Sequence, residues 1–515
     1  MDNQFPLPGP TAMVPGPTPM TPASPLNPLT PSPVSPSPTL SNLTPPEEAA
    51  PPPPGYQPPA ATGAPVIKAS LARLILPIGV GLIVIGLIAY IIFRLFFGSK
   101  TQAPVSVTPS PAVTLTYFGL WEPTSVMKPV IDAFQAKNPN IVIDYQMQSS
   151  QDYQDRVKIA LQSSNSPDIV RLHTTWLPLF ATDLLPAPPN TLSATELNTN
   201  FYPIVGKLLV ASNQVYGAPM TAEGLGLFVN TAMLQQKQLQ PPKTWEDLLT
   251  VAKAVKEADP LTGKITRAGV ALGNTTNVEN WPDIVSLMLL QAGISLTDIQ
   301  GSEVSTTLTY YTDFVTKHGV WDETMPPSTV AFANEKVAMI IAPSWKARDI
   351  KAINPGLSWQ VFPVPQLPDV DPTNWASIWF EGVSKNSKHP LEAWKFVSFL
   401  ASAEAQQILF DSATTDRGFP QPPANKAVAE TASKNPVLAP FIAELPTAKS
   451  FYTASMTQDS KTALNSRLIK YLEDAINGLI AHQETPKVVE ALHNGFVQVL
   501  SQYGLVAAPT PTPTP

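Results

Sequence analysis

The chain has 515 residues, a formal net charge of −7, 60 prolines and no cysteine. The missing cysteine excludes disulfides, thiolate nucleophiles, cysteine-ligated zinc, iron–sulfur clusters and a lipid-modified N-terminal cysteine. The 32 lysines and arginines against 39 acidic residues leave no basic surplus, which argues against a nucleic-acid partner.

The first 67 residues form a proline-rich segment with very few charges and few large apolar side chains. Proline has no amide donor and a fixed φ, and so few large apolar residues cannot offset the entropy of ordering the chain. We expect a disordered tail that serves as a spacer, which we favour over a ligand for an aromatic groove. Residues 506–515 predict a second disordered tail, rich in proline and threonine.

Twenty uncharged residues, 74–93, follow within a predicted anchor segment, 68–98. As a helix they span roughly 30 Å, the thickness of the bilayer hydrocarbon. A signal peptide has a shorter apolar core near the chain start, so we predict an uncleaved single-pass transmembrane helix in contact with lipid. Two basic residues flank each side, Lys68 and Arg73 before it and Arg94 and Lys100 after it, so charge does not orient the helix.

After a linker, 99–111, the composition is that of a globular domain over 112–505. Its first part alternates strand-like and helix-like segments. The strand patterns cover 113–118, 140–148 and 168–172, and the helix patterns cover 125–137 and 153–161. This order predicts an α/β fold with a parallel sheet.

Helix patterns continue later in the chain. Thr244 and Asp247 form a capping-box pattern that opens a helix. Pro390 begins a helix predicted to bury Leu391 and Trp394 on one side, and the stripe from 468 to 479 predicts another helix.

Catalytic and metal-binding motifs are missing from the sequence. It has no G-x-S-x-G elbow or Walker A run, and its five histidines show no i,i+4 pair. Asp369 and Asp371 resemble the start of a calcium loop, but the glycine and the terminal glutamate are out of place. We therefore expect no enzyme activity, no cofactor and no metal, although paired carboxylates for glycoside hydrolysis stay open because they meet only in space.

Three stretches carry a family resemblance: YGAPMTAEGLGLFVN…PPKTWEDLL within 216–259, VAFANEKVAMIIAPSW at 330–345, and GVSKNSKHPLEAWKFVSFLASAEAQQ at 382–407. Their content and order resemble family 1 extracellular solute-binding proteins, the sugar-binding components of ABC importers. The resemblance covers about 113–505.

The resemblance implies a two-lobed periplasmic-binding-protein type II fold. Lobe 1 would hold about 112–221 and 362–402, and lobe 2 about 222–361 and 403–505, with hinges near 220–223 and 361–365. It also implies a monomer whose extracytoplasmic domain captures a sugar or oligosaccharide by lobe closure and delivers it to ABC permease subunits. A membrane-anchored receptor or adhesin for glycan or peptide is the alternative.

Ligand in such folds binds beyond the carboxyl ends of strands and between lobes. Two strand-to-helix turns qualify, one with Trp121 and Glu122 and one with His173 and Trp176. Indole faces stack on sugar rings and carboxylates accept hydrogen bonds from hydroxyls.

Further candidates come from the resemblance and from residues near its motifs. The family implies Glu223 at the entry to the second lobe and Trp345 as a stacking residue. Trp281, Trp379, Glu381 and Arg417 are additional candidates, and the arginine would indicate an anionic ligand. Packing in the core is the alternative for every tryptophan, and it is favoured for Trp245 and Trp394.

Overall fold

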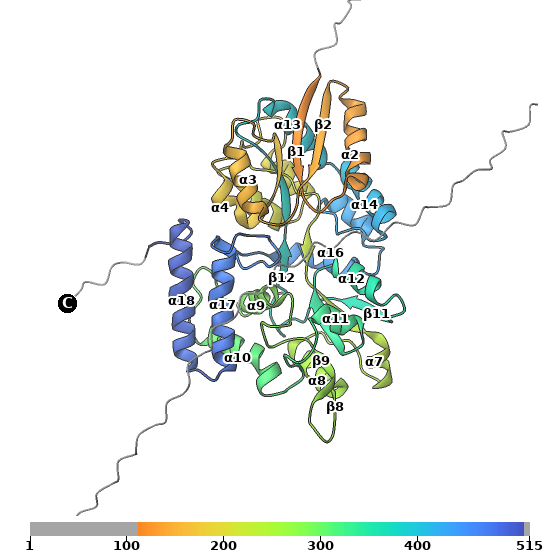
Figure 1. Cartoon of the computed structure of the whole chain (residues 1–515), viewed down its shortest axis with the longest axis vertical. Coiled ribbons are helices and arrows are strands. Elements are labelled where there is room, and N and C mark those ends of the chain that lie inside the picture. Colours follow the sequence, from red (N-terminus) through yellow and green to blue (C-terminus); the bar gives the residue numbers. More distant parts are fainter. Residues whose placement is uncertain (1–111, 509–515) are drawn as a thin grey trace, which may run out of the picture. The chain divides into compact units, whose positions relative to one another are not determined.

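The computed structural model describes residues 112–508 (Figure 1). The predicted N-terminal tail, transmembrane segment and linker, and most of the C-terminal tail, lie outside these residues and stay predictions. Between residues 112 and 508, no helix is long and apolar enough to cross a membrane.

The first lobe is built on a four-stranded sheet with the order β13-β3-β1-β2. Its strands are β1 (Val113–Gly119), β2 (Ile141–Met147), β3 (Ile169–His173) and β13 (Trp379–Val383). β1 pairs in parallel with β2 and β3, whereas β13 runs antiparallel to β3. The predicted strand–helix alternation is therefore confirmed for the first three strands, and β13 returns from much later in the chain.

Helices whose apolar faces enter the same core surround this sheet. They are α2 (Thr124–Lys137), α3 (Tyr153–Gln162), η1 (Thr174–Trp176), α4 (Leu177–Phe180), α5 (Ala194–Asn200), α6 (Pro203–Leu209), α13 (Pro390–Leu400), α14 (Ala403–Arg417) and α15 (Lys426–Ala432). A short hairpin, β4 (Val210–Ala211) and β5 (Gln214–Val215), follows α6. In α13, Trp394 is buried as expected, but Leu391 is 64% exposed because it lies in the first turn, at the surface.

The second lobe is built on a five-stranded sheet with the order β11-β7-β10-β9-β8. The strands are β7 (Gly226–Asn230), β8 (Glu257–Ala258), β9 (Ile265–Val270), β10 (Val337–Ala342) and β11 (Trp359–Phe362). Its helices are α7 (Thr231–Gln236), α8 (Trp245–Val255), α9 (Trp281–Gln291), α10 (Ser302–Thr316), α11 (Ser328–Ala333), α12 (Lys346–Ile353), α17 (Leu464–Ile480) and α18 (Thr485–Gln502). The capping box at Thr244 is confirmed, since Thr244 and Asp247 bond each other's backbone at the start of α8.

A third, small sheet with the order β14-β12-β6 lies between the two cores (Figure 1). It contains β6 (Glu223–Gly224), β12 (Asn374–Ser377) and β14 (Ala448–Lys449). Along β12, Trp375 belongs to the second core and Ala376 to the first, so the chain passes between lobes here. Near β14 lie α16 (Ala439–Glu444) and η2 (Leu445–Thr447).

The observed lobes differ from the predicted ranges in two places. α14 and α15, predicted in lobe 2, pack in the core of lobe 1, because the apolar face of α14 lies against α2. The second crossing is at β12 rather than at 361–365, because β11 pairs with β7 and Val364 is buried in the second core. The first crossing, at β6, is where the sequence places it.

Candidate functional site

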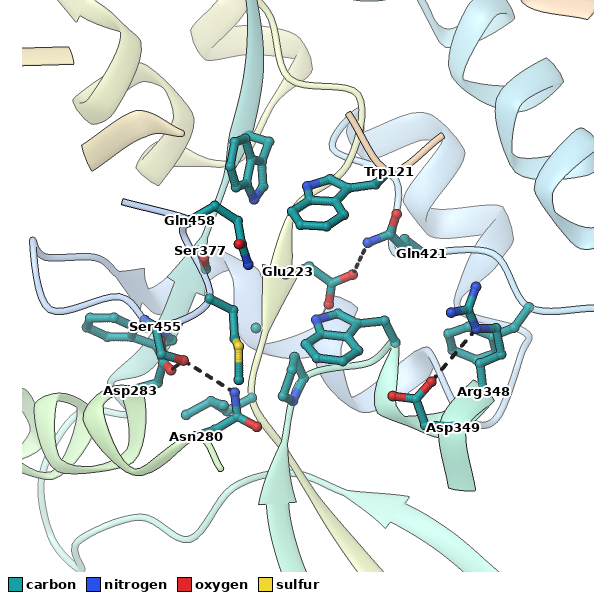
Figure 2. Close-up of a pocket in the computed structure, with 18 of the residues that line it drawn as sticks. Trp121, Glu223, Asn280, Asp283, Arg348, Asp349, Ser377, Gln421, Ser455 and Gln458 are labelled. Atoms are coloured by element: carbon teal, nitrogen blue, oxygen red, sulfur yellow. Dashed lines mark hydrogen bonds and ion pairs between the residues drawn. The ribbon is translucent and has the colours of Figure 1, made fainter. Parts of the chain in front are cut away.

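A cavity of about 350 Å³ is lined by side chains from both lobes and from the crossing strands (Figure 2). Trp121 lies at the end of β1 in lobe 1, and Trp345 lies between β10 and α12 in lobe 2. Glu223 reaches the cavity from the crossing strand β6. The cavity is therefore lined by lobe 1, by lobe 2 and by a strand that connects them. A movement of one lobe relative to the other would change its shape.

Tryptophan is the dominant apolar residue of the lining, with indoles at positions 121, 345, 375 and 379. Trp121 and Trp379 meet edge to face, with ring centroids 5.9 Å apart. Trp121 is 41% exposed and has a φ of 73°, a left-handed conformation that is rare for a bulky side chain. Such strain persists only where the surroundings impose it, and it is often found at binding sites.

Glu223 bonds to both sides of the cavity. Its Oε1 accepts hydrogen bonds from Ser344 Oγ at 3.0 Å and from Gln421 Nε2 at 2.8 Å, and its Oε2 accepts one from the Ser344 amide at 3.2 Å. Burial raises the pKa of Glu223 to about 7, although the bonds from Ser344 and Gln421 oppose the shift. This carboxyl group can therefore exchange a proton near neutral pH.

Asp283, in the first turn of α9, is a second buried carboxyl group in the lining. Its Oδ1 accepts hydrogen bonds from Trp375 Nε1 at 2.8 Å and from the Ser455 amide at 3.1 Å. Burial raises the pKa of Asp283 to about 6, against these hydrogen bonds. Asp283 thus orients Trp375 and ties the segment around Ser455 to α9.

Two arginines complete the charged lining. Arg417, at the end of α14, pairs with Glu122 at 2.9 Å between Nη2 and Oε2. The Nε atom of Arg348 lies 3.9 Å from Oδ1 of its neighbour Asp349. Each guanidinium thus has a carboxylate partner already. No group of three histidine, aspartate or glutamate side chains suited to a metal ion occurs among residues 112–508.

The sequence model described as "Bacterial extracellular solute-binding protein" matches residues 121–407, more than half of the chain. The chain belongs to this family. The match begins at the first cavity tryptophan and ends in α14, so it contains most of both lobes.

Named relatives agree with this assignment. The "Multiple sugar-binding protein" of Streptococcus mutans is 24% identical over 340 residues, which are 60% of this chain and 76% of that protein. The solved structure of the sugar-binding protein MalE from Xanthomonas citri has a TM-score of 0.63 at 20% identity and covers 76% of this chain and 98% of MalE. An ABC transporter solute-binding protein from Thermotoga lettingae, bound with α-D-tagatose, has a TM-score of 0.56 at 20% identity and covers 76% of this chain and all of that protein. At this identity, the solved structures establish the two-lobed α/β fold.

In this solute-binding protein, five of the ten candidate residues line the one cavity: Trp121, Glu223, Trp345, Trp379 and Arg417. They come from the turn after β1, from β6, from the β10–α12 turn, from β13 and from α14, which are far apart in sequence.

The other five candidates do not line it. Glu381 is fully buried and pairs with Arg171 at 2.6 Å, and Glu122 is 2% exposed in the same network of charges. His173 and Trp176 are buried behind Trp379, with ring centroids 5.1 and 5.2 Å from it. Trp281 is 7% exposed and packs in the core of lobe 2. These residues lie behind the cavity wall or in the core.

Several polar lining residues escaped the sequence analysis. Asn280 is the N-cap residue of α9 and Asp283 lies in its first turn, so both line the cavity from the start of this helix, three residues apart. That spacing was the available signal. Gln421, Ser455 and Gln458 lie in loops without a regular pattern, so nothing in their local sequence marks them.

Proposed function

We propose that this solute-binding protein captures a sugar or oligosaccharide in the cavity between its lobes. The observation that carries the proposal is four indoles and several carboxyl and amide groups around one cavity. Indole faces pack on the apolar C–H faces of sugar rings, and the polar groups match ring hydroxyls. The relatives named as sugar-binding proteins support this ligand class.

Capture would proceed by lobe closure without covalent chemistry. Trp121 and Trp379 contact the ligand from lobe 1 and Trp345 contacts it from lobe 2, so a bound sugar favours the conformation in which both walls touch it. The closed form would then dock on ABC permease subunits, which take up the ligand when the lobes separate.

The cellular arrangement is part of the same proposal. Residues 74–93 would anchor the chain in the cell membrane, and the binding domain would act outside the cytoplasm as a monomer. The proline-rich tail would then be cytoplasmic. The family description as extracellular supports the location of the binding domain.

A thermal-shift screen of sugars, amino acids and short peptides would identify the ligand class. A ligand at a hundred times its Kd stabilises the folded state by about 2.7 kcal/mol, so binding raises Tm measurably. We expect stabilisation by sugars alone. Stabilisation by amino acids or peptides alone would contradict the proposal.

Calorimetry on Trp345→Ala would then test the site. Loss of one stacking indole should weaken sugar binding at least about tenfold. Trp359→Ala is the matched control, because Trp359 also belongs to lobe 2 but stacks on Phe228, outside the cavity. Equal sugar affinity in Trp345→Ala and the unmodified protein would refute this site.

A further inference from the structure

The segment 455–465, here called the clasp segment, is fixed to lobe 2 at both ends. At its start, the Ser455 amide bonds to Asp283 on α9. Thr453, just before it, bonds through its hydroxyl to Ser286 at 2.6 Å. At its other end, Leu464 is buried in the second core at the start of α17. The segment therefore moves with lobe 2.

Side chains and backbone of the clasp segment also bond to lobe 1. Trp176 Nε1 donates to Asp459 Oδ1 at 2.7 Å, and Asn465 Nδ2 donates to Thr175 Oγ1 at 2.8 Å. The Ser460 amide donates to Gln154 Oε1 at 3.2 Å. Gln154 belongs to α3, and Thr175 and Trp176 form η1, all within the first lobe. Three hydrogen bonds thus join the two lobes at a place outside the strands β6 and β12, through which the chain crosses between them.

These bonds lie directly behind one wall of the cavity. Met456 and Gln458 of the clasp segment line it, as does Trp379. Trp176 packs edge-on against Trp379, and His173 Nε2 lies 3.0 Å from the hydroxyl of Ser377, another lining residue. The clasp contact and the position of the Trp379 indole are therefore mechanically linked through Trp176.

The Trp176–Asp459 bond is the strongest of the three on chemical grounds. Trp176 is 1% exposed, and the acceptor is a carboxylate, so the bond can be charge-assisted. Among the described contacts, the other side chain that donates to Asp459 is the neutral hydroxyl of Thr457 on the same segment, and no lysine or arginine pairs with Asp459 there. Opening the lobes would have to break this bond in a largely buried setting.

We propose that the clasp segment holds the two lobes in contact and positions Trp379, and thereby sets how long a ligand is retained. The retention of ligand rests on the proposed function, whereas the lobe contact does not. Trp176 and Asp459 act here as positioning residues, since neither lines the cavity.

The lobe contact can be tested without any ligand. The chain has no cysteine, so cysteines introduced at two exposed sites, Ile159 on α3 and Ala491 on α18, can carry spin labels without background. Double electron–electron resonance on the full-length chain would report the distance between the lobes. We expect Asp459→Ala and Trp176→Phe each to shift the distribution to longer distances.

Trp394→Phe is the matched control. Trp394 is also a fully buried indole, but its Nε1 donates to the Leu185 carbonyl within lobe 1 at 3.1 Å. It should destabilise the protein to a similar extent and leave the distance between lobes unchanged. Distributions identical to that of the unmodified protein in both clasp variants would overturn the proposal.

Stopped-flow release of the sugar found in the thermal screen would test retention. Each clasp variant should release it about tenfold faster, the equivalent of one lost hydrogen bond. The double variant should release it no faster than the quicker single variant, because both substitutions remove the same bond. Additive effects, or no change in the release rate, would contradict the clasp, while failure to bind any sugar would refute the proposed function and leave the distance measurement to decide the clasp.

Discussion

Each lobe contains an arginine that faces a glutamate across an antiparallel strand pair. In lobe 1, Arg171 of β3 pairs with Glu381 of β13 at 2.6 Å. In lobe 2, Arg267 of β9 pairs with Glu257 of β8 at 2.8 Å. In both lobes the two residues lie directly opposite each other, but the side chains are 5% and 0% exposed in lobe 1 and 30% and 43% exposed in lobe 2.

The buried pair belongs to a larger network. Arg171 also donates to the Leu120 carbonyl at 2.8 Å, and Tyr117 donates to Glu381 at 3.1 Å. Glu122 lies 4.0 Å from Arg171 and pairs on its other side with Arg417, which lines the cavity. Alternating charges thus lead from the interior of lobe 1 to the cavity. In lobe 2, the described chain of alternating charges that reaches the cavity, Glu279–Lys346–Asp349–Arg348, does not include the Arg267–Glu257 pair.

The comparison indicates that the burial of an ion pair, rather than its residue types, determines how its loss affects the stability of the protein. An exposed pair is screened by water and contributes little. A buried pair costs much desolvation, so its removal as a whole can be neutral, but loss of one partner leaves an uncompensated buried charge. The network therefore fixes the arrangement behind Trp121 more than it stabilises the fold.

The largest expected effect on stability comes from replacing the arginine of each pair. Arg171→Met should lower the free energy of unfolding by about 3–5 kcal/mol, because Glu381 and Glu122 lose their cation in a buried site. Arg267→Met, the matched change in lobe 2, should cost less than about 1 kcal/mol. Urea unfolding of both variants measures the difference, and equal losses would show that burial does not separate the pairs.

Much of the fold was predictable from the sequence, since its local patterns agree with its tertiary packing. The strand–helix alternation of 113–172 and the capping box at Thr244 both appear as expected. The lobe to which α14 and α15 belong was not predictable in this way. An amphipathic helix records that it has a buried face, but not which of two cores covers that face.

The candidate site shows the same limit at the level of single residues. Trp121 and Glu122 are adjacent and equally suited to a sugar site, yet one lines the cavity and the other faces the buried Arg171. Residue type makes Trp281 a candidate, but its neighbours Asn280 and Asp283 line the cavity and Trp281 does not. Residue type indicates a site's chemistry, whereas the direction of a side chain depends on backbone geometry that the sequence pattern does not record.

The next effect concerns Glu223, a buried carboxyl group that, unlike Glu381, has only neutral hydrogen-bond donors. Glu223 keeps its proton up to a pKa of about 7 in the folded protein, against an ordinary value of 4.5. The folded state then binds more protons than the unfolded state between these values, so stability falls as pH rises from about 4.5 to about 7. The fall due to Glu223 is on the order of 3 kcal/mol.

Glu223→Gln should remove this part of the pH dependence. Chemical unfolding between pH 4 and 8 would show a flatter profile in the variant than in the unmodified protein. Asp283, with a pKa of about 6, causes a separate and smaller decrease in stability as the pH rises towards 6. Asp283→Asn would remove that decrease. Parallel profiles of Glu223→Gln and the unmodified protein would contradict a raised pKa for Glu223.

The smallest effect compares the backbone at two tryptophans that line the cavity from different lobes, Trp121 and Trp345. Trp121 has a φ of 73°, whereas Trp345 has a φ of −66°. At a left-handed position, a Cβ costs roughly 1–2 kcal/mol, which exceeds the extra entropy that glycine loses on folding. Trp121→Gly should therefore be about 1 kcal/mol more stable than Trp121→Ala.

The order should reverse at Trp345, where alanine adopts the backbone without strain and glycine only adds entropy to the unfolded chain. Trp345→Gly should be about 0.4–1 kcal/mol less stable than Trp345→Ala. Thermal unfolding of the four variants gives both differences, and the unequal loss of indole packing at the two sites cancels within each pair. If alanine were the more stable replacement at both positions, the wall of lobe 1 would hold no more backbone strain than the wall of lobe 2.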